Sequence, residues 1–358
     1  MDNFLWMLDN KYTPQNFLSD EVSVKLACEF ALDCWQILPT VWSRLENLVK
    51  SSGSYSTYLE PVHDRLTSMQ VLAKVQHRIL GRFLSELESQ YIPFVLLKGT
   101  ASRALVYKQE TDRCGVDIDI GIPKEAIYDA EKIALELGFY KAEWNRKTKR
   151  FSIMTDQTLR SQVESKHYQL GFLVREQVIT GLSSETVTAI KRDIEHQDPW
   201  HLTESEELAC YVSLDLHHGL ALNCSVDGPI ASAIEVEQGG LRMRVPSVSW
   251  LIFHLVYKIY MEGVATYKKG GYQYADLLRL VDILDSQGTQ DLVRLFEKYT
   301  LEIPAFYVLR RLPMHFSREL KPELRDLLNK HGITPSSEVD AYQLNDLGDM
   351  WGKLWGKR

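Results

Sequence analysis

The feature that most constrains this chain is an alternation of apolar and acidic residues at positions 115–123, Gly-Val-Asp-Ile-Asp-Ile-Gly-Ile-Pro. A period of two is typical of a β-strand, because successive side chains point to opposite faces of a sheet. Val116, Ile118 and Ile120 would then face the core, while Asp117 and Asp119 would share the other face. The segment therefore predicts a rigid strand with an acidic face.

Strand and helix patterns alternate around this segment, and helical patterns dominate on both sides of it. Residues 92–97 predict a buried strand that ends at Lys98-Gly99, with a helix from Thr100 over 101–107, and residues 209–216 predict another strand. Such alternation indicates an α/β or α+β core. We expect three regions: an N-terminal helical region (1–90), the mixed core (91–225) and a C-terminal helical region (226–358).

Composition limits the class of partner and the compartment. The 358 residues carry a formal net charge of −7 and a pI near 5.9, which disfavours a dedicated duplex-binding protein. The five cysteines are scattered without a CxxC pair, so neither a disulfide framework nor a cysteine zinc site is indicated. We find no secretory signal and no apolar run of about 20 residues, and expect a cytoplasmic protein.

The acidic pair suggests metal chemistry. Asp117 and Asp119 on one strand face would repel each other when both are ionised, and a hard divalent cation such as Mg²⁺ would offset that repulsion. This is a credible platform for phosphoryl or nucleotidyl transfer. The alternative is a solvated polar face of an edge strand.

Residues near the pair could hold phosphates. Gly99 at a strand-to-helix turn lets backbone amides approach an anion, and Lys98 could add a positive charge. Thr100 is either an N-cap or a hydroxyl donor to phosphate. Arg113 is a candidate phosphate clamp, or else the partner of Asp112 or Glu110 in an ion pair.

A third carboxylate would complete the site. Asp215 lies between Leu214 and Leu216 on a predicted strand, so a neighbouring position in the sheet could bring it beside the acidic pair. It could then accept the proton of an acceptor hydroxyl, or be no more than an exposed strand carboxylate. His217 and His218 point to opposite faces, so they cannot easily share a metal, and we expect structural or substrate-contact roles for them.

These residues carry a resemblance to a known family. The chain resembles the uncharacterised nucleotidyltransferase family of the polymerase-β-like superfamily in three ordered segments: Lys98-Gly99, Arg113-Cys114-Gly115-Val116-Asp117-Ile118-Asp119, and Leu214-Asp215-Leu216-His217. It departs from the wider superfamily at Lys98-Gly99-Thr100, where a Gly-Ser or Gly-Gly turn is usual.

The resemblance implies a polymerase-β-like nucleotidyltransferase core of α+β class, a short mixed sheet with flanking helices, between N- and C-terminal helical regions. It implies Asp117 and Asp119 as metal ligands, Asp215 as the third acid, and Lys98, Gly99 and Arg113 near a triphosphate. Independently of the resemblance, we expect base recognition by stacking on aromatic residues of the C-terminal helices, such as Tyr257, Tyr260 or Tyr267. The tail, with Trp351 and Trp355 four residues apart, would dock on the body or on a partner.

The function that these observations favour is a Mg²⁺- or Mn²⁺-dependent nucleotidyltransferase that moves an NMP group from an NTP to an acceptor. The acidic composition makes long nucleic acid a less favoured acceptor than a small molecule, peptide or protein. One alternative is a non-catalytic nucleotide-binding or interaction module of the same fold. Another is a different Mg²⁺ enzyme, although P-loop and protein-kinase motifs are absent from the sequence.

Overall fold

The computed structural model describes residues 8, 21–51, 56–145, 150–154, 169–194, 199–221, 224–266, 271–316 and 318–330. The chain forms two compact units, residues 24–246 and residues 1–23 with 247–358, and each is described by itself. These units do not coincide with the three regions expected from the sequence, and that division stays a prediction. No helix in the described ranges is long and apolar enough to cross a membrane.

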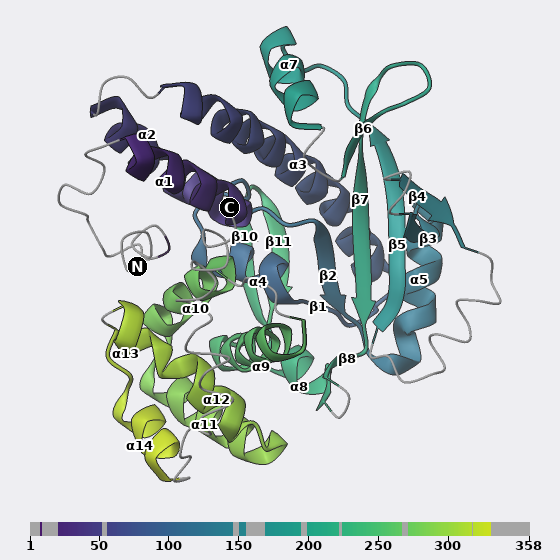
Figure 1. Ribbon diagram of the computed structural model, residues 1–358. Coiled ribbons are helices and arrows are strands. Elements are labelled where there is room, and N and C mark those ends of the chain that lie inside the picture. Colours follow the sequence, from purple (N-terminus) through teal and green to yellow (C-terminus); the bar gives the residue numbers. More distant parts are fainter. Residues whose placement is uncertain are drawn as a thin grey trace. The chain divides into compact units, whose positions relative to one another are not determined.

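The unit of residues 24–246 is built on a mixed sheet (Figure 1). Its strands follow the spatial order β1-β2-β7-β5-β3-β4, and β6 also pairs with β7. In chain order they are β1 (Val95–Leu96), β2 (Asp117–Gly121), β3 (Tyr140–Asn145), β4 (Arg150–Ile153), β5 (Gln169–Val178), β6 (Trp200–Leu202) and β7 (Leu208–His217). Strands β2 and β7 run parallel, whereas the other pairs are antiparallel.

Strand β7 is the centre of this sheet, and all ten of its residues are buried. Its side chains alternate between an apolar set at the even positions from 208 to 216 and a second set at the odd positions from 209 to 217, which includes Asp215 and His217. Because a strand buried on both faces has no solvent-facing side, the polar residues of the second set must find partners within the protein.

Helices accompany the sheet. In chain order they are α1 (Glu21–Asp33), α2 (Leu38–Ser51), α3 (Ser56–Ser89), α4 (Lys98–Val106), α5 (Ile127–Glu136), α7 (Ser184–Asp193) and α8 (Asp227–Ala231). Helices α3 and α5 contact each other and β7, and α4 contacts β2. A buried ion pair connects α7 to α3: Nε of Arg65 on α3 donates to Oδ1 of Asp193 on α7 at 2.7 Å.

Two small hairpins complete this unit. Strands β8 (Gly219–Ala221) and β9 (Cys224–Ser225) form one, and β10 (Ile234–Gln238) and β11 (Leu241–Val245) form the other. Gly239 and Gly240 connect β10 to β11 with positive φ angles of 56° and 75°, a conformation that glycine adopts without strain. Gln238 then donates to the carbonyls of Arg103 and Tyr107, which joins the hairpin to the end of α4.

The second unit is helical where it is described. Its helices are α9 (Val248–Thr266), α10 (Gly271–Ile283), α11 (Ser286–Tyr299), α12 (Glu302–Leu309), α13 (Arg311–Phe316) and α14 (Pro322–Lys330). Asp285 caps α11 by accepting from the backbone N–H of Gly288 at 2.6 Å. Phe253 of α9 packs on Phe296 of α11, with ring centroids 5.8 Å apart.

The expected α+β class, with a short mixed sheet and flanking helices, is confirmed. The strand expected over 92–97 is shorter, and the helix expected over 101–107 begins earlier, at Lys98. The C-terminal tail with Trp351 and Trp355 lies outside the described residues.

Candidate active site

The predicted acidic residues come from two neighbouring parallel strands. In the register of β2 against β7, Asp119 lies directly opposite Asp215, and Asp117 lies opposite Ser213. Residues opposite one another in a parallel pair point to the same face of the sheet, so the two aspartates share that face. Asp119 and Asp215 are each only 3% exposed. Two carboxylates are therefore adjacent where little water can screen them.

His217 belongs to the same cluster. Its Nε2 lies 3.0 Å from Asp119 Oδ1 and 3.3 Å from Asp215 Oδ2, and the side chain is fully buried. Ligand atoms of Asp119, Asp215 and His217 all lie within 4.8 Å of one another. Burial and Lys98 would lower the pKa of His217, but hydrogen bonds to the two aspartates outweigh them and raise it.

Asp117 lies two residues before Asp119 on β2, on the same face of the sheet. It is half-buried, whereas Asp119 is buried, and it is not in the group of three ligand residues found among the described parts of the chain. It still acts on the cluster, because its charge helps to raise the pKa of Lys98. The structure therefore brings together Asp119, Asp215 and His217, with Asp117 at the edge.

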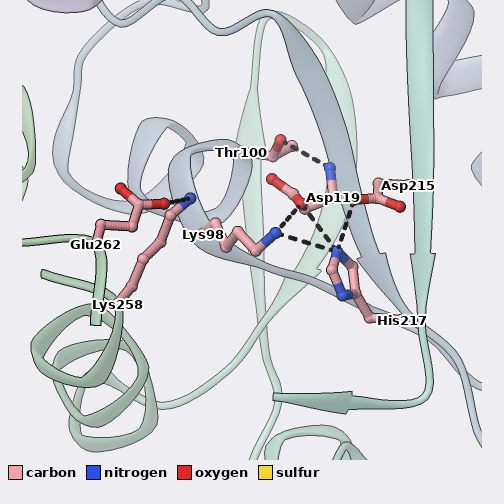
Figure 2. A network of polar contacts seen from close by, with 7 residues as sticks. All are labelled: Lys98, Thr100, Asp119, Asp215, His217, Lys258 and Glu262. Carbon is pink, nitrogen blue, oxygen red and sulfur yellow. Dashed lines mark hydrogen bonds and ion pairs between the residues drawn. The ribbon is translucent and has the colours of Figure 1, made fainter. Parts of the chain in front are cut away.

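Lys98 supplies the positive charge of this cluster (Figure 2). Its ammonium donates to Asp119 Oδ1 at 2.6 Å and lies 3.2 Å from His217 Nε2, while the side chain is 15% exposed. Burial alone would lower the pKa of Lys98, but the charges of Asp119, Asp215 and Asp117 outweigh it and raise the pKa. The lysine is therefore held as a cation.

The backbone at Lys98 is unusual for a residue with a side chain. Lys98 has a φ of 47°, in the left-handed region, at the point where β1 gives way to α4. A non-glycine residue in this region carries strain of about 1–3 kcal/mol, which the surrounding structure must offset. The contact with Asp119 is one such compensating interaction.

Gly99 and Arg113 lie against each other. A Cβ atom added at Gly99 would stand 2.7 Å from Nη2 of Arg113, so the end of the arginine side chain would have to shift. Arg113 is buried, and its guanidinium also donates to the carbonyl of Cys114. Glycine at position 99 thus accommodates the arginine, and these two residues predicted to lie near a phosphate are neighbours in space.

Thr100 connects the helix to the acidic strand. Its Oγ1 accepts from the backbone N–H of Asp119 at 3.4 Å, and the side chain is buried. The N-cap position of α4 is Leu97, which makes no side-chain cap. The N-cap role considered for Thr100 is therefore wrong, because the helix begins two residues before it.

The position of His217 was not foreseen from the sequence. His217 is the last residue of β7 and His218 follows the strand, so the expected opposite orientation of the two histidines stays a prediction. Only one of them needs to face the aspartates. Asp215 and His217 are two residues apart on a strand, just as Asp117 and Asp119 are, and this spacing places both on one face. The same period of two would have identified His217.

The donor set fits a divalent cation. Carboxylate oxygens are ligands of Mg²⁺ and Mn²⁺, and imidazole nitrogen is a ligand of transition metals. Asp215 Oδ1 is buried and has no hydrogen-bond partner among the described residues, which is costly unless another group completes its bonding. Asp119, Asp215 and His217 are therefore the residues that could hold a metal ion.

The second unit contains a separate polar network. Lys258 and Glu262, also drawn in Figure 2, form an ion pair along α9 at 3.6 Å, and Gln273 of α10 donates to Glu262 at 2.9 Å. Of the aromatic residues suggested for base recognition, Tyr260 packs beside Tyr307 at a centroid distance of 6.0 Å. Tyr267 lies outside the described residues, and base recognition by this group stays a prediction.

Comparison with solved structures finds nucleotidyltransferases at low identity. The solution structure of the antibiotic-resistance factor ANT(2'')-Ia shares 14% identity over 64% of this chain and 95% of its own, with a TM-score of 0.34. A crystal structure of ANT(2'')-Ia with adenylyl-2''-tobramycin also shares 14% identity, over 64% of this chain and 99% of its own, with a TM-score of 0.33.

A third structure is an antigenic nucleotidyltransferase-like protein from Paracoccidioides brasiliensis. It shares 13% identity over 72% of this chain and 93% of its own, with a TM-score of 0.28. No match was found among curated proteins.

The family comparison covers the whole candidate site. The model of the uncharacterised nucleotidyltransferase family matches residues 34–317, a span that includes Lys98, Asp119, Asp215 and His217. The match extends over well more than half of the chain and agrees with the resemblance carried by the sequence motifs. The protein belongs to the uncharacterised nucleotidyltransferase family.

Proposed function

We propose that this protein is a Mg²⁺- or Mn²⁺-dependent enzyme that transfers an NMP group from an NTP to an acceptor and releases pyrophosphate. The observation that carries the proposal is the juxtaposition of Asp119 and Asp215 in register on β2 and β7, with Lys98 at the start of α4 beside them. Membership of the nucleotidyltransferase family supports the reaction class.

Asp119, Asp215 and His217 would hold the metal, and Asp117 would add an oxygen from the same sheet face. When bound, the ion would neutralise charge on the triphosphate and assist in-line displacement at the α-phosphorus. Because the donor set contains an imidazole as well as carboxylates, Mn²⁺ belongs in every test beside Mg²⁺.

The phosphates would bind where the protein offers positive charge at a helix start. Lys98 and Arg113 would contact phosphate oxygens, and Gly99 and Thr100 would place the backbone of the first turn of α4 against them. Both cations are largely buried, so an anion that reached them would be attracted through little intervening water.

Asp215 would also serve the acceptor. In the reaction an acceptor hydroxyl oxygen bonds to the α-phosphorus, the bond from that phosphorus to the bridging oxygen breaks, and pyrophosphate leaves with the electron pair. The hydroxyl proton would pass to Asp215 Oδ1, the carboxylate oxygen with no hydrogen-bond partner in the described ranges.

The acceptor is proposed to be a small molecule, peptide or protein rather than long nucleic acid. The formal net charge of −7 would repel an extended phosphate backbone unless a basic surface opposed it. A cytoplasmic location is part of the proposal and is consistent with five cysteines that are all free and buried.

Nucleotide binding tests this proposal. Each of the four NTPs is added with Mg²⁺ or Mn²⁺, and the melting temperature and the release of pyrophosphate in the presence of a metabolite extract are measured. A ligand at a hundred times its Kd stabilises the folded state by about 2.7 kcal/mol, so at least one NTP should raise the melting temperature. EDTA should abolish most of the increase, because the triphosphate and the aspartates repel each other without a cation.

The contrary outcome is equally clear. If every NTP with excess Mg²⁺ or Mn²⁺ leaves the melting curve unchanged, the enzyme proposal fails. A non-catalytic interaction module of the same fold would then be the better account of the chain.

A further inference from the structure

The ammonium of Lys98 contacts the very atoms that would bind a metal. It donates to Asp119 Oδ1 at 2.6 Å and lies 3.2 Å from Nε2 of His217, and those two residues belong to the group whose ligand atoms lie within 4.8 Å of one another. An ammonium and a dication at such separations repel each other strongly. Lys98 and a metal ion would therefore compete for the same oxygen of Asp119.

We propose that Lys98 is an internal counter-ion for Asp119 that must be released before the site accepts a divalent ion, so that the metal enters efficiently only together with an NTP. This inference rests on the proposed function and adds to it the order in which the site is filled. Free metal would have to displace the lysine without offering it another anion. A metal–nucleotide complex would bring triphosphate oxygens to which the lysine can turn.

The position of Lys98 in the fold allows such an exchange. It is the first residue of α4, next to Gly99, so its side chain begins at the helix terminus where a phosphate would bind. A short rotation of a flexible four-carbon stem can carry the ammonium from a carboxylate to a phosphate. The side chain is 15% exposed, which leaves the ammonium too little water to remain without an anion in either state.

The backbone of Lys98 supports a specific purpose for this contact. A φ of 47° directs the chain at position 98 into a conformation that lysine rarely adopts. A lysine that merely ended a strand would need no such conformation. Strained residues of this kind persist where the surroundings hold them, and here Asp119 is part of those surroundings.

Metal binding in the absence of nucleotide tests the inference directly. Binding of Mn²⁺ is measured by the loss of the free-ion signal in electron paramagnetic resonance, for the wild type, Lys98→Met and Lys98→Arg. Lys132→Met is the matched control, because Lys132 is an exposed lysine of α5 whose ion pair is with Glu136 on the same helix, at 3.9 Å. We expect Lys98→Met to bind Mn²⁺ about tenfold or more tightly than the wild type. Lys98→Arg and Lys132→Met should resemble the wild type.

Addition of nucleotide provides a second measurement. An NTP should strengthen Mn²⁺ binding to the wild type by a large factor, because the lysine gains a new partner. In Lys98→Met this enhancement should shrink by about tenfold or more, since there is no lysine to release. If Lys98→Met does not fold, Lys98→Gln replaces it, because glutamine retains a hydrogen bond to Asp119 without the charge.

The outcomes separate this inference from the proposed function. If the wild type binds Mn²⁺ with NTP but the uncharged variants bind free Mn²⁺ no better than the wild type, the counter-ion inference is wrong and the proposed function stands. If no variant binds Mn²⁺ with or without NTP, both are wrong. Asp119→Asn in the Lys98→Met background should abolish the tight binding, and persistence of that binding would place the ion elsewhere and overturn the inference.

Discussion

Asp119 on β2 and Asp215 on β7 lie directly opposite each other across parallel strands, and both contact Nε2 of His217, yet their carboxylates differ in their other contacts. Asp119 accepts from the Lys98 ammonium at 2.6 Å, whereas Asp215 contacts His217 at 3.3 Å through one oxygen and leaves Oδ1 without a hydrogen-bond partner in the described residues. Two aspartates with nearly equal burial thus have unequal roles in the metal-free protein.

The first prediction follows from this difference. Without Lys98, the removal of either crowded charge would be expected to stabilise the metal-free protein. Asp119→Asn should instead destabilise it by about 3–5 kcal/mol, because it leaves a mostly buried ammonium without its nearest anion. Asp215→Asn should change the free energy of unfolding little, since relief of repulsion offsets the lost contact with His217. Urea unfolding in EDTA measures both, and equal losses would contradict this account.

Both substitutions should nevertheless abolish transfer. Each removes an oxygen ligand and, for Asp215, the proposed proton acceptor, so the loss should appear in kcat/KM even where the fold is intact. Circular dichroism of each variant is the control for folding. A purified variant that is fully active would exclude that aspartate from the metal centre.

The second prediction concerns the two adjacent histidines. His217→Asn should weaken Mn²⁺ binding and lower the rate of pyrophosphate release by about 10–100-fold, because Nε2 contacts both aspartates. His218→Asn is the matched control, since His218 is the neighbouring histidine and lies just beyond the end of β7. It should bind Mn²⁺ and turn over like the wild type. A larger effect at His218 than at His217 would contradict the assignment of His217 to the metal centre.

Much of the acidic site could be predicted from the sequence, because it depends on local periodicity. The alternation around Asp117 and Asp119 indicates a strand and tells which residues share a face, and the same holds for Leu214-Asp215-Leu216. That these two strands are neighbours agrees with the expectation drawn from their shared polar faces. His217 was accessible by the same rule, applied from Asp215.

Other features depend on contacts between distant segments and have no local signal. The contact between Lys98 and Asp119 requires β1, α4 and β2 to be in place, and a left-handed lysine is not expected from propensity. Likewise, the reason for glycine at position 99 is Arg113, which lies fourteen positions further along the chain. The β10–β11 hairpin, in contrast, has a readable signal in Gly239-Gly240, a pair typical of two-residue hairpin loops.

The third prediction tests the fit of Arg113 against Gly99. In Gly99→Ala the new methyl group would stand 2.7 Å from Nη2 of Arg113, and the buried guanidinium would have to move. We expect a loss of about 1–3 kcal/mol in the free energy of unfolding, as for other overpacked sites, together with weaker NTP binding. Gly138→Ala is the control for backbone strain without overpacking. Gly138 has a φ of 85°, and no described atom lies within 4 Å of the position that a Cβ atom would take. If Arg113→Ala restores the stability of Gly99→Ala, the clash is the cause; a clash elsewhere would leave the double variant as unstable as the single one.

The last prediction uses the buried thiol of Cys210 on β7. Burial raises the pKa of Cys210 from 9.0 to about 12, so the folded protein keeps the thiol neutral where the unfolded chain ionises it. Its contribution to stability is complete below pH 9 and is lost as the pH rises towards 12, because the unfolded state then binds fewer protons than the folded state. Between pH 8 and pH 10 the loss for one such thiol is about 1.4 kcal/mol.

Cys210→Ala should therefore lose about 1.4 kcal/mol less than the wild type over this interval in urea unfolding under reducing conditions. Val212→Ala, a truncation two residues along the same strand, should retain the wild-type pH dependence. An unchanged pH dependence in Cys210→Ala would show that this thiol ionises equally in both states.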